Sequence, residues 1–519
     1  MRRPGAARQS GTALSASDNR ARGRLRARRL GLDTHSEAVV FMHKDCPVCR
    51  AEGFEAHNRV LLKAHGKHII ATLYQVTGNL VDLCDAALSD EAWLRLALKD
   101  GDEIAVEHPE PIESLASVRG RIYGNALDGA SLRAIIADVA DGRYSSIEIG
   151  AFLTACAANP LTSEEVLSLT RAMVQVGDHL TWNSDIVVDK HSVGGLPGNR
   201  TTPIVVAIAA AVGLTMPKTS SRAITSPAGT ADMMETLAPV DLDADAIHRV
   251  VEREGGCIVW GGAVRLSPAD DILIRVERAL DIDTEGQMIA SVLSKKVAAG
   301  ATHLVLDMPV GPTAKVRTNA AATALSQGLL QVAQEFGIKT RVIATDGNQP
   351  VGRGIGPALE ALDVLAVLKN DPDAPSDLRE RSLALSGALL ELAHAAEEGS
   401  GAALAARVLV EGRAWEKFQR ICEAQGGMRI PPVSSERHEI VSRQKGRLHR
   451  IDNRKVAKLA KLAGAPEDRA AGIRLHAHLG DSMEIGQPLC TVHAEAPGEL
   501  SYALAYASSN PDIFEVVEE

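Results

Sequence analysis

The chain has 519 residues, of which 45% are hydrophobic and 24% charged, with a formal net charge of −10. This length exceeds what one hydrophobic core organises, and roughly 100–200 residues per domain predicts several domains. The acidic balance and an aromatic content of 3% argue against a broad nucleic-acid surface, which needs clustered cations and stacking side chains.

Seven cysteines, an odd number with one close pair, favour a reduced, cytoplasmic protein over a disulfide scaffold. No apolar run reaches the roughly 18 residues that a membrane-spanning helix needs, so we expect no membrane association. Residues 1–30 are rich in arginine and lack the apolar segment of a secretory signal. We interpret them as a disordered tail, and a transit peptide is the alternative because it shares this composition.

Residues 31–110 alternate short apolar runs with polar breaks, which predicts a small strand-rich N-terminal domain. After two prolines in H-P-E-P-I-E-S-L, residues 112–180 have the spacing of helices, one of which begins with the capping-box pair Thr162 and Glu165. In residues 181–430, short β-branched runs alternate with helical segments, and this alternation predicts an α/β domain that ends in helices at 376–397 and 401–425. Residues 431–519 form a predicted C-terminal domain, in which we interpret G-E-L-S-Y-A-L-A-Y-A as a strand.

The stretch K-H-S-V-G-G-L-P-G-N-R-T-T, residues 190–202, lies between a predicted strand at 186–188 and an apolar helix. Thr202 before Pro203 predicts that the helix begins there, with Thr202 as its N-cap. Backbone N–H groups at a helix start attract phosphate, and Lys190 adds a cation. The sequence therefore predicts an anion site, whose alternative is a glycine-rich turn with a solvated lysine.

A second loop, S-S-R-A-I-T-S-P-A-G-T-A-D at 220–232, follows a predicted strand at 214–219 and offers several hydroxyls and Arg222. Thr230 or Asp232 is the predicted N-cap of the next helix. Loops that follow successive strands of an α/β sheet meet at one edge, where such folds bind ligands. The two loops therefore predict one shared site.

A third segment, residues 273–296, contains three polar candidates, Asp283, Ser291 and Lys295. A helical pattern from residue 287 places Ser291 and Lys295 four residues apart on one face. The alternative is a surface helix with a solvated lysine.

Lys190-His191-Ser192-x-Gly194-Gly195 resembles the phosphate loop of the thymidine/pyrimidine-nucleoside phosphorylase family, and Ser291-x-x-x-Lys295-Lys296 resembles its base-binding helix. The resemblance extends over roughly residues 112–519. S-S-R-A-I-T-S-P-A-G-T stands where the ordinary bacterial pattern has S-G-R-G-x-x-H-T-G-G-T, and an extra Pro-Gly-Asn follows Gly195. Both departures are similar to the second branch of the family, which contains the AMP phosphorylases and the proteins named putative thymidine phosphorylase.

The resemblance implies a multidomain α/β fold. A helical lobe (112–180 with about 268–298) and an α/β lobe (181–430) would stand beside the β-rich N-terminal domain and an α+β C-terminal domain (431–519). It implies phosphate ligands at Lys190, Ser192, Gly195, Thr202, Ser220 and Thr230. It implies nucleoside or nucleotide ligands at Ser221, Arg222, Ala223, Ile224, Thr225, Ser226, Arg275, Ser291, Lys295 and Lys315. His191 would face both substrates, and Asp283 matches the proton donor of AMP phosphorylase.

The implied reaction is phosphorolysis of an N-glycosidic bond by inorganic phosphate. Thymidine would give thymine and 2-deoxyribose 1-phosphate. The alternative is AMP, giving adenine and ribose 1,5-bisphosphate, with Lys218 and Arg222 as cations for its 5′-phosphate. Asp283 as an acid, or His191 or Lys295 as a hydrogen-bond donor, would neutralise the departing base. We expect a homodimer or higher homo-oligomer that needs no cofactor or metal.

Three other readings remain. A phosphoribosyltransferase of similar fold would need Mg²⁺ and a diphosphate sugar, and a silent nucleotide sensor would bind its ligand without consuming it. In the N-terminal domain, His43, Cys46, Cys49 and His57 offer four zinc-ligand types. One C-x-x-C with two histidines is a weak zinc signal, and we interpret the cysteines as a reduced structural pair.

Overall fold

The computed structural model describes residues 24–34, 37–223, 226–282 and 284–518. The chain divides into two compact units, residues up to 125 with 137–155, and residues 126–136 with 156–519. Two helices, α5 (Gly129–Ala140) and α6 (Ser146–Ala158), contribute to both units. In the described ranges, no helix has both the length and the apolar character needed to cross a bilayer.

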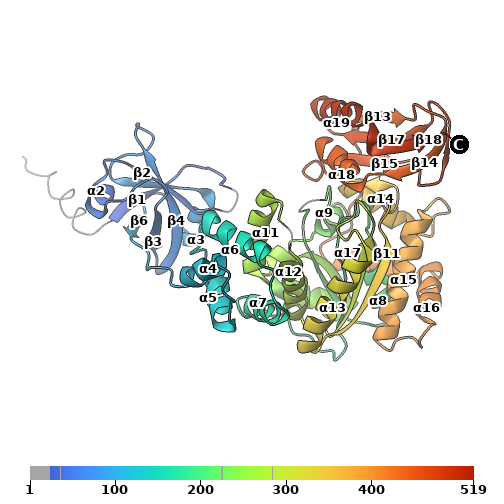
Figure 1. Ribbon diagram of the computed structural model, residues 1–519, viewed down its shortest axis with the longest axis horizontal. Helices are drawn as coiled ribbons and strands as arrows, with labels where there is room; N and C mark the ends of the chain where they lie inside the picture. The colour runs from blue at the N-terminus through green and yellow to red at the C-terminus, as the bar shows by residue number, and fades with distance from the viewer. Residues whose placement is uncertain (1–23, 35–36, 224–225, 283, 519) are drawn as a thin grey trace, which may run out of the picture. The chain divides into compact units, whose positions relative to one another are not determined.

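The first unit contains a closed barrel with the strand order β1-β5-β2-β4-β3-β6 (Figure 1). The strands are β1 (Arg24–Arg29), β2 (Val39–His43), β3 (Arg59–Ala64), β4 (Lys67–Val76), β5 (Asp85–Leu88) and β6 (Glu103–Glu107), with helices α2 (Pro47–Glu52), α3 (Asp90–Leu96) and α4 (Leu115–Ile122). Val40, Leu62 and Leu73 are fully buried in its core. The prediction of a strand-rich N-terminal domain is confirmed.

The predicted disordered tail is wrong for residues 24–29, which form β1. Leu25 and Ala27 are buried, whereas the four arginines of the strand lie outside and pair with acidic neighbours, as Arg26 does with Asp85 at 2.9 Å. The arginine-rich composition concealed this alternation of period two, which is the signal of a half-buried strand. The rest of the tail prediction, residues 1–23, lies outside the described residues.

The second unit contains five parallel strands, β7 (Val188–Ser192), β8 (Met216–Ser220), β9 (Gly256–Trp260), β10 (His303–Val310) and β11 (Lys339–Asp346). A parallel bridge between Val187 and Thr215 joins β7 to β8, so the spatial order is β11-β10-β7-β8-β9. The chain therefore reverses its direction of strand addition between β7 and β10. In open α/β sheets, ligands bind at the carboxyl ends of the strands beside such a reversal.

Helices surround this sheet (Figure 1). They are α7 (Ser163–Gln175), α8 (Thr202–Ala211), α9 (Thr230–Glu235), α10 (Ala244–Glu254), η1 (Gly261–Ala263), α11 (Pro268–Leu280), α12 (Glu285–Ala298), α13 (Asn319–Glu335), α14 (Pro357–Leu368), α15 (Ser376–Leu392), α16 (Gly401–Val410) and α17 (Arg413–Ala424). The capping box of α7 is confirmed, because Glu165 N donates to Thr162 Oγ1 and the Glu165 carboxylate accepts from Thr162 N. The helix predicted at 401–425 is two helices, because Gly412 takes a left-handed conformation (φ 77°) between them.

The C-terminal region has two small sheets, ordered β12-β15-β17-β13 and β16-β14-β18. Its elements are β12 (Gly354–Ile355), β13 (Glu436–Val441), β14 (Gly446–Ile451), α18 (Asn453–Leu462), β15 (Gly472–Leu475), β16 (Ser482–Met483), β17 (Pro488–Ala494), α19 (Pro497–Ser509), η2 (Pro511–Ile513) and β18 (Phe514–Val517). The strand predicted at G-E-L-S-Y-A-L-A-Y-A is wrong, since this stretch lies in α19. Pro497 occupies the start of the helix, and Leu500, Ala503 and Ala507 pack on the core at helical spacing.

Candidate active site

The two predicted ligand loops begin at the same edge of the sheet. β7 ends at Ser192 and its neighbour β8 ends at Ser220. The strand predicted at 186–188 is displaced towards the loop, because parallel pairing with β10 continues as far as Ser192 opposite Asp307. Lys190, His191 and Ser192 are therefore strand residues, held more rigidly than loop residues would be.

Lys190 provides a buried cation at this edge. Its side chain is 1% exposed, and its Nζ donates to Thr201 Oγ1 at 2.6 Å and lies 4.0 Å from Asp307 Oδ2. Burial lowers the pKa of Lys190 to about 8, against the opposing effect of Asp307. The first helical residue of α8 is Thr202 and its N-cap is Thr201, one residue earlier than predicted.

Asp189, the residue before Lys190 in β7, forms ion pairs with two further lysines. Asp189 Oδ1 lies 3.2 Å from Lys218 Nζ, and Asp189 Oδ2 lies 2.7 Å from Lys296 Nζ, with all three side chains at most 5% exposed. Burial opposes ionisation of Asp189, but the two ammonium groups lower its pKa below the ordinary value. The hypothesis that Lys218 serves a 5′-phosphate is therefore not supported, because its charge is committed to Asp189.

His191 is a neutral imidazole in this setting. Burial, followed by the positive charges of Lys296 and Lys218, lowers its pKa well below 6.5. A neutral ring has one N–H donor and one acceptor nitrogen. His191 can therefore donate a hydrogen bond at neutral pH without carrying charge.

We expect the His191 ring to remain neutral between pH 6 and 8. The unfolded chain takes up a proton at this histidine below about 6.5, whereas the folded protein does not. Its contribution to the free energy of unfolding is therefore complete above about pH 6.5 and is lost as the pH falls below that value. NMR titration of labelled histidines, assigned by comparison with His191→Gln, measures this. A His191 resonance that titrates near pH 6.5 would contradict it.

Gly195 brings the loop after β7 against the loop after β10. Gly195 has φ +81°, and a Cβ atom there would lie 2.5 Å from the backbone nitrogen of Lys315. Only glycine allows this close approach of two backbone segments. The geometry therefore juxtaposes Gly195, which the resemblance assigns to phosphate, and Lys315, which it assigns to the nucleoside or nucleotide.

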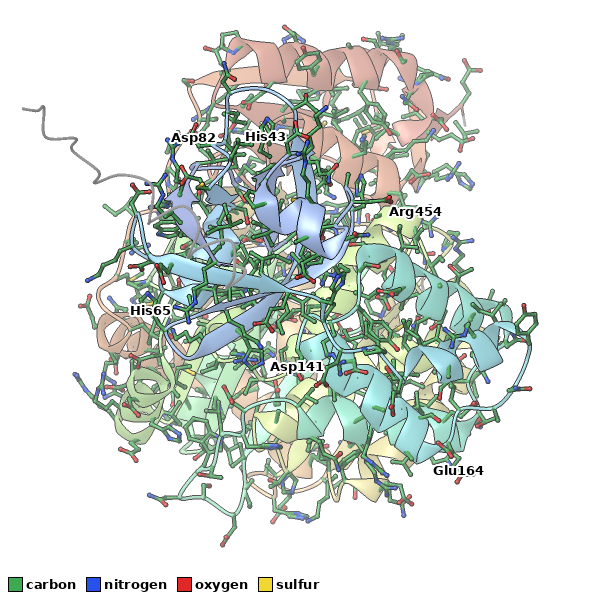
Figure 2. All side chains as sticks on the ribbon, turned by 90° about the vertical axis from the view of Figure 1, so that its left-hand side faces the viewer. His43, His65, Asp82, Asp141, Glu164 and Arg454 are labelled. Atoms are coloured by element: carbon green, nitrogen blue, oxygen red, sulfur yellow. The ribbon has the colours of Figure 1, made fainter. Side chains whose placement is uncertain are left out.

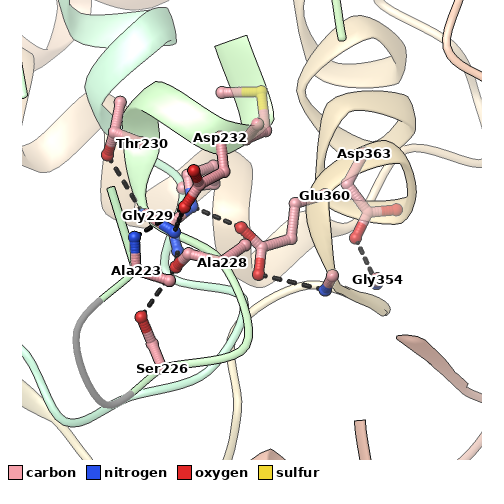
Figure 3. Close-up of polar contacts among 12 residues, drawn as sticks. Ala223, Ser226, Ala228, Gly229, Thr230, Asp232, Gly354, Glu360 and Asp363 are labelled. Carbon is pink, nitrogen blue, oxygen red and sulfur yellow. Dashed lines mark hydrogen bonds and ion pairs between the residues drawn. The ribbon is translucent and has the colours of Figure 1, made fainter. Parts of the chain in front are cut away.

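The second loop is organised by Asp232. Its Oδ2 accepts from the backbone N–H groups of Ala223 and Gly229, at 2.6 and 2.8 Å (Figure 3). Asp232 is thus the third residue of α9, and Gly229 is the N-cap in place of the predicted Thr230 or Asp232. Ser226 Oγ donates to Ala228 O at 2.7 Å (Figure 3).

Arg222 does not offer an uncommitted charge to a ligand. It pairs with Glu235 at 2.7 Å and Asp232 at 3.3 Å, and its guanidinium lies 5.0 Å from the centre of the Trp260 ring. The hypothesis that Arg222 binds a 5′-phosphate is therefore weakened. In the same loop, Ser221 is exposed, whereas Ile224 and Thr225 lie outside the described residues.

Ser220, at the end of β8, is the buried hydroxyl that the resemblance assigns to phosphate. The residue is 9% exposed, and its Oγ has no hydrogen-bond partner among the described residues. A buried polar atom without a partner is costly unless a ligand or water satisfies it. Ser220 therefore has hydrogen-bonding capacity left for a bound molecule.

The predicted base-binding pair lies on one face of α12, as its spacing predicts. Ser291 Oγ donates to Asp270 Oδ2 at 2.9 Å, and Lys295 Nζ lies 2.5 Å from the same oxygen. Burial by itself would lower the pKa of Lys295. The negative charge of Asp270 outweighs this effect and raises the pKa, so Lys295 stays charged. Arg275 lies on α11 together with Asp270, and Asp283 lies outside the described residues.

Several polar residues that complete this site were not singled out from the sequence. They are Asp189, Asn199, Arg200, Asp270, Asp307 and Glu360, and each is buried. Charged residues are seldom fully buried without a partner. The available signal was an acidic residue inside an apolar strand, as Asp307 is in L-V-L-D-M-P-V, but the sequence does not show which cation it pairs with.

The candidate zinc ligands of the barrel do not form a comparable site. Cys46 and Cys49 are both buried, Cys49 N donates to Cys46 Sγ at 3.1 Å, and His43 Nδ1 is engaged with Asp45 N. Within the described ranges, no group of three or more His, Cys, Asp or Glu side chains is placed to hold a metal ion.

An open cavity of about 380 Å³ lies on the barrel beside His65, which is labelled in Figure 2. Two of its cations, Arg24 and Lys63, already have acidic partners in Glu103 and Glu107, and Lys67 is exposed. This cavity therefore lacks the uncommitted, buried hydrogen-bonding groups that the sheet edge presents.

Sequence models of known families match three consecutive parts of the chain. The glycosyl transferase family, helical bundle domain, matches residues 118–177, and its a/b domain matches residues 184–415. The pyrimidine nucleoside phosphorylase C-terminal domain matches residues 447–513.

Relatives of similar length are also known. A protein of Sphingopyxis alaskensis named "Putative thymidine phosphorylase" is 60% identical over 502 residues, covering 96% of this chain and 98% of that protein. One of Polaromonas sp. with the same name is 58% identical over 496 residues, covering 96% and 97%. Among solved structures, anthranilate phosphoribosyltransferase from Thermus thermophilus has a similar fold, with a TM-score of 0.50 at 20% identity, covering 60% of this chain and 99% of that one.

Proposed function

Since the chain belongs to the "Putative thymidine phosphorylase" family, we propose that it cleaves thymidine with inorganic phosphate, giving thymine and 2-deoxyribose 1-phosphate. The observation that carries this proposal is the buried Lys190 at the carboxyl end of β7. A cation held beside hydroxyls and helix N–H groups, and shielded from water, is suited to a small tetrahedral anion. Ser192, Ser220 and Thr230 are the hydroxyls of this proposed phosphate site.

In this reaction a phosphate oxygen attacks C1′, and the electron pair of the broken C1′–N bond leaves with the base. The protein must hold phosphate in line with that bond, which is a positioning effect. It must also stabilise the negative charge on the departing base. We propose Lys190 with Gly195 and Thr202 for the first task. For the second, we propose Lys295, with neutral His191 as a further donor. Ser291 donates its hydroxyl hydrogen to Asp270, so we propose that it contacts the base as an acceptor.

Thymidine is favoured over AMP by the state of two cations. A 5′-phosphate would need cations near the second loop. Both candidate cations there already form ion pairs: Lys218 pairs with Asp189, and Arg222 pairs with Glu235. Asp189 also pairs with Lys296 and Glu235 with Arg469, at 2.7 and 3.1 Å, so a 5′-phosphate would have to compete with these carboxylates for Lys218 or Arg222. Residues 221–226, Arg275 and Lys315 would then contact the nucleoside, and Asp283 is the alternative acid for the departing base.

The experiment is incubation of the purified protein with phosphate and either thymidine or AMP, without added metal, followed by chromatography of the free base. We expect thymine from thymidine and much less adenine from AMP. Omission of phosphate is the control and should abolish thymine release. Adenine from AMP alone would transfer the proposal to the nucleotide reaction, and tight binding without turnover would identify a sensor.

We further propose the domain division expected from the sequence, with the N-terminal boundary moved to include β1. The family match supports a protein that acts on small molecules. We propose that it works in the cytoplasm as a homodimer or higher homo-oligomer.

A further inference from the structure

Asn199 and Arg200 are adjacent residues in the loop between β7 and α8, and both are buried (8% and 9% exposed). Polar side chains of this kind are rarely buried without a defined set of hydrogen bonds. The contacts of these two residues lead, in each case, to a hydroxyl of the proposed phosphate site.

Arg200 joins the two ligand loops. Its Nη1 donates to Thr230 Oγ1 at 3.0 Å, and its Nη2 donates to the backbone oxygen of Ala228 at 2.9 Å. Its Nε forms a short ion pair with Glu360 of α14, whose side chain is fully buried. Glu360 in turn accepts from Gly356 N at 3.2 Å, so the carboxylate that holds the guanidinium is itself held in place.

Asn199 donates in a similar way to a hydroxyl of the first loop. Its Nδ2 donates to Asp307 Oδ2 at 2.8 Å and to Ser192 Oγ at 3.2 Å. The ionised carboxylate of Asp307 can only accept hydrogen bonds. The amide nitrogen of Asn199, not its oxygen, therefore faces Asp307 and Ser192. Asp307 is itself fixed by Thr345 Oγ1 at 2.6 Å.

A hydroxyl group has one hydrogen and two lone pairs. When an N–H group occupies one lone pair, the hydrogen of the hydroxyl turns away from that donor. Ser192 and Thr230 each receive such an N–H group, from Asn199 and from Arg200. Each hydroxyl hydrogen is therefore left to be donated to another acceptor.

We propose that Asn199 and Arg200 are positioning residues for phosphate, because they orient the Ser192 and Thr230 hydroxyls as donors to the anion. The two residues need not touch phosphate to do this. The inference rests on the proposed function, since it takes inorganic phosphate as the co-substrate of this site.

The test measures binding of inorganic phosphate by calorimetry without nucleoside, and then the KM for phosphate and for thymidine. Arg200→Lys keeps the charge opposite Glu360 but loses the planar set of donors that reaches three acceptors. Asn199→Asp keeps the shape but removes the donor to Ser192. We expect each variant to weaken phosphate binding and raise the KM for phosphate about tenfold, with the KM for thymidine changed less than about twofold.

A double variant separates orientation from general structural support. If Arg200 acts through Thr230, Arg200→Lys adds little to the loss already caused by Thr230→Val. The exposed pair Arg413–Glu411 provides a matched control, and Arg413→Lys should leave phosphate binding unchanged.

The outcomes are distinguishable. Wild-type protein that binds no phosphate would overturn the proposed function and this inference with it. Phosphate binding that persists unchanged in Arg200→Lys and Asn199→Asp would overturn the inference alone, as would fully additive effects of Arg200→Lys and Thr230→Val. Should Arg200→Lys fail to fold, Asn199→Asp with Ser192→Ala provides the equivalent pair on the first loop.

Discussion

Replacing Lys190 with methionine is expected to lower kcat/KM for phosphate by about 100- to 1,000-fold, the usual effect of removing one preorganised charge partner. Lys190 is 1% exposed, so water cannot replace its charge when phosphate enters. Methionine has a similar length and removes only the ammonium group. The measurement is phosphorolysis at varied phosphate concentration, together with calorimetric phosphate binding.

The pH dependence of phosphate binding gives a second readout for Lys190. Because its pKa lies at about 8 in the free protein, the ammonium form that attracts phosphate is present below that value and is lost above it. Phosphate affinity should therefore fall as the pH rises through about 8 in the wild type, and this fall should be absent in Lys190→Met. Lys63→Met, on the barrel surface, is the matched control. Retention of wild-type affinity within about threefold in Lys190→Met would contradict the assignment.

Replacing Asp189 with asparagine is expected to lower the free energy of unfolding by about 3–5 kcal/mol, the usual cost of breaking a buried ion pair from one side. The substitution leaves the ammonium groups of Lys218 and Lys296 buried without their shared carboxylate. Denaturant unfolding, followed by fluorescence of the tryptophans, measures the loss. Phosphorolysis should also fall, because Asp189 directly precedes Lys190 in β7.

Lys218→Met is the comparison that makes this prediction specific. The Asp189 carboxylate already has a second partner in Lys296, and burial lowers the pKa of Lys218, so its charged form is poorly accommodated. Removing this lysine should therefore cost less than about 1 kcal/mol, well below the cost of Asp189→Asn. Equal losses in the two variants would contradict the view that the carboxylate holds the group together.

The sequence by itself determined the order of domains and most of the secondary structure, because these depend on local patterns. Short apolar runs with polar breaks predicted the strand-rich N-terminal domain, and the capping box predicted the start of α7. The errors had local causes too. Arginines concealed β1, and small apolar residues made α19 resemble a strand.

The motifs of the two loops and of α12 also came from the sequence, and the helical spacing of Ser291 and Lys295 was sufficient to place both on one face. Spacing could not show that they meet Asp270, which lies on another helix 21 residues before Ser291. Nor could it show that Lys218 and Arg222 already have acidic partners. A sequence motif therefore does not show which of its charged side chains are available to a ligand.

Only the tertiary structure decided those pairings, because they join residues far apart in the chain. Arg200 and Glu360 are separated by 160 positions and Asn199 and Asp307 by 108, yet each pair is buried together. A side chain with several possible partners is assigned one only when the fold removes water and the competing groups, since the cost of an unpaired charge rises with burial. The sequence thus named the chemistry of the phosphate loop, and the packing of β7, β10 and α14 determined which of its groups remain to bind phosphate.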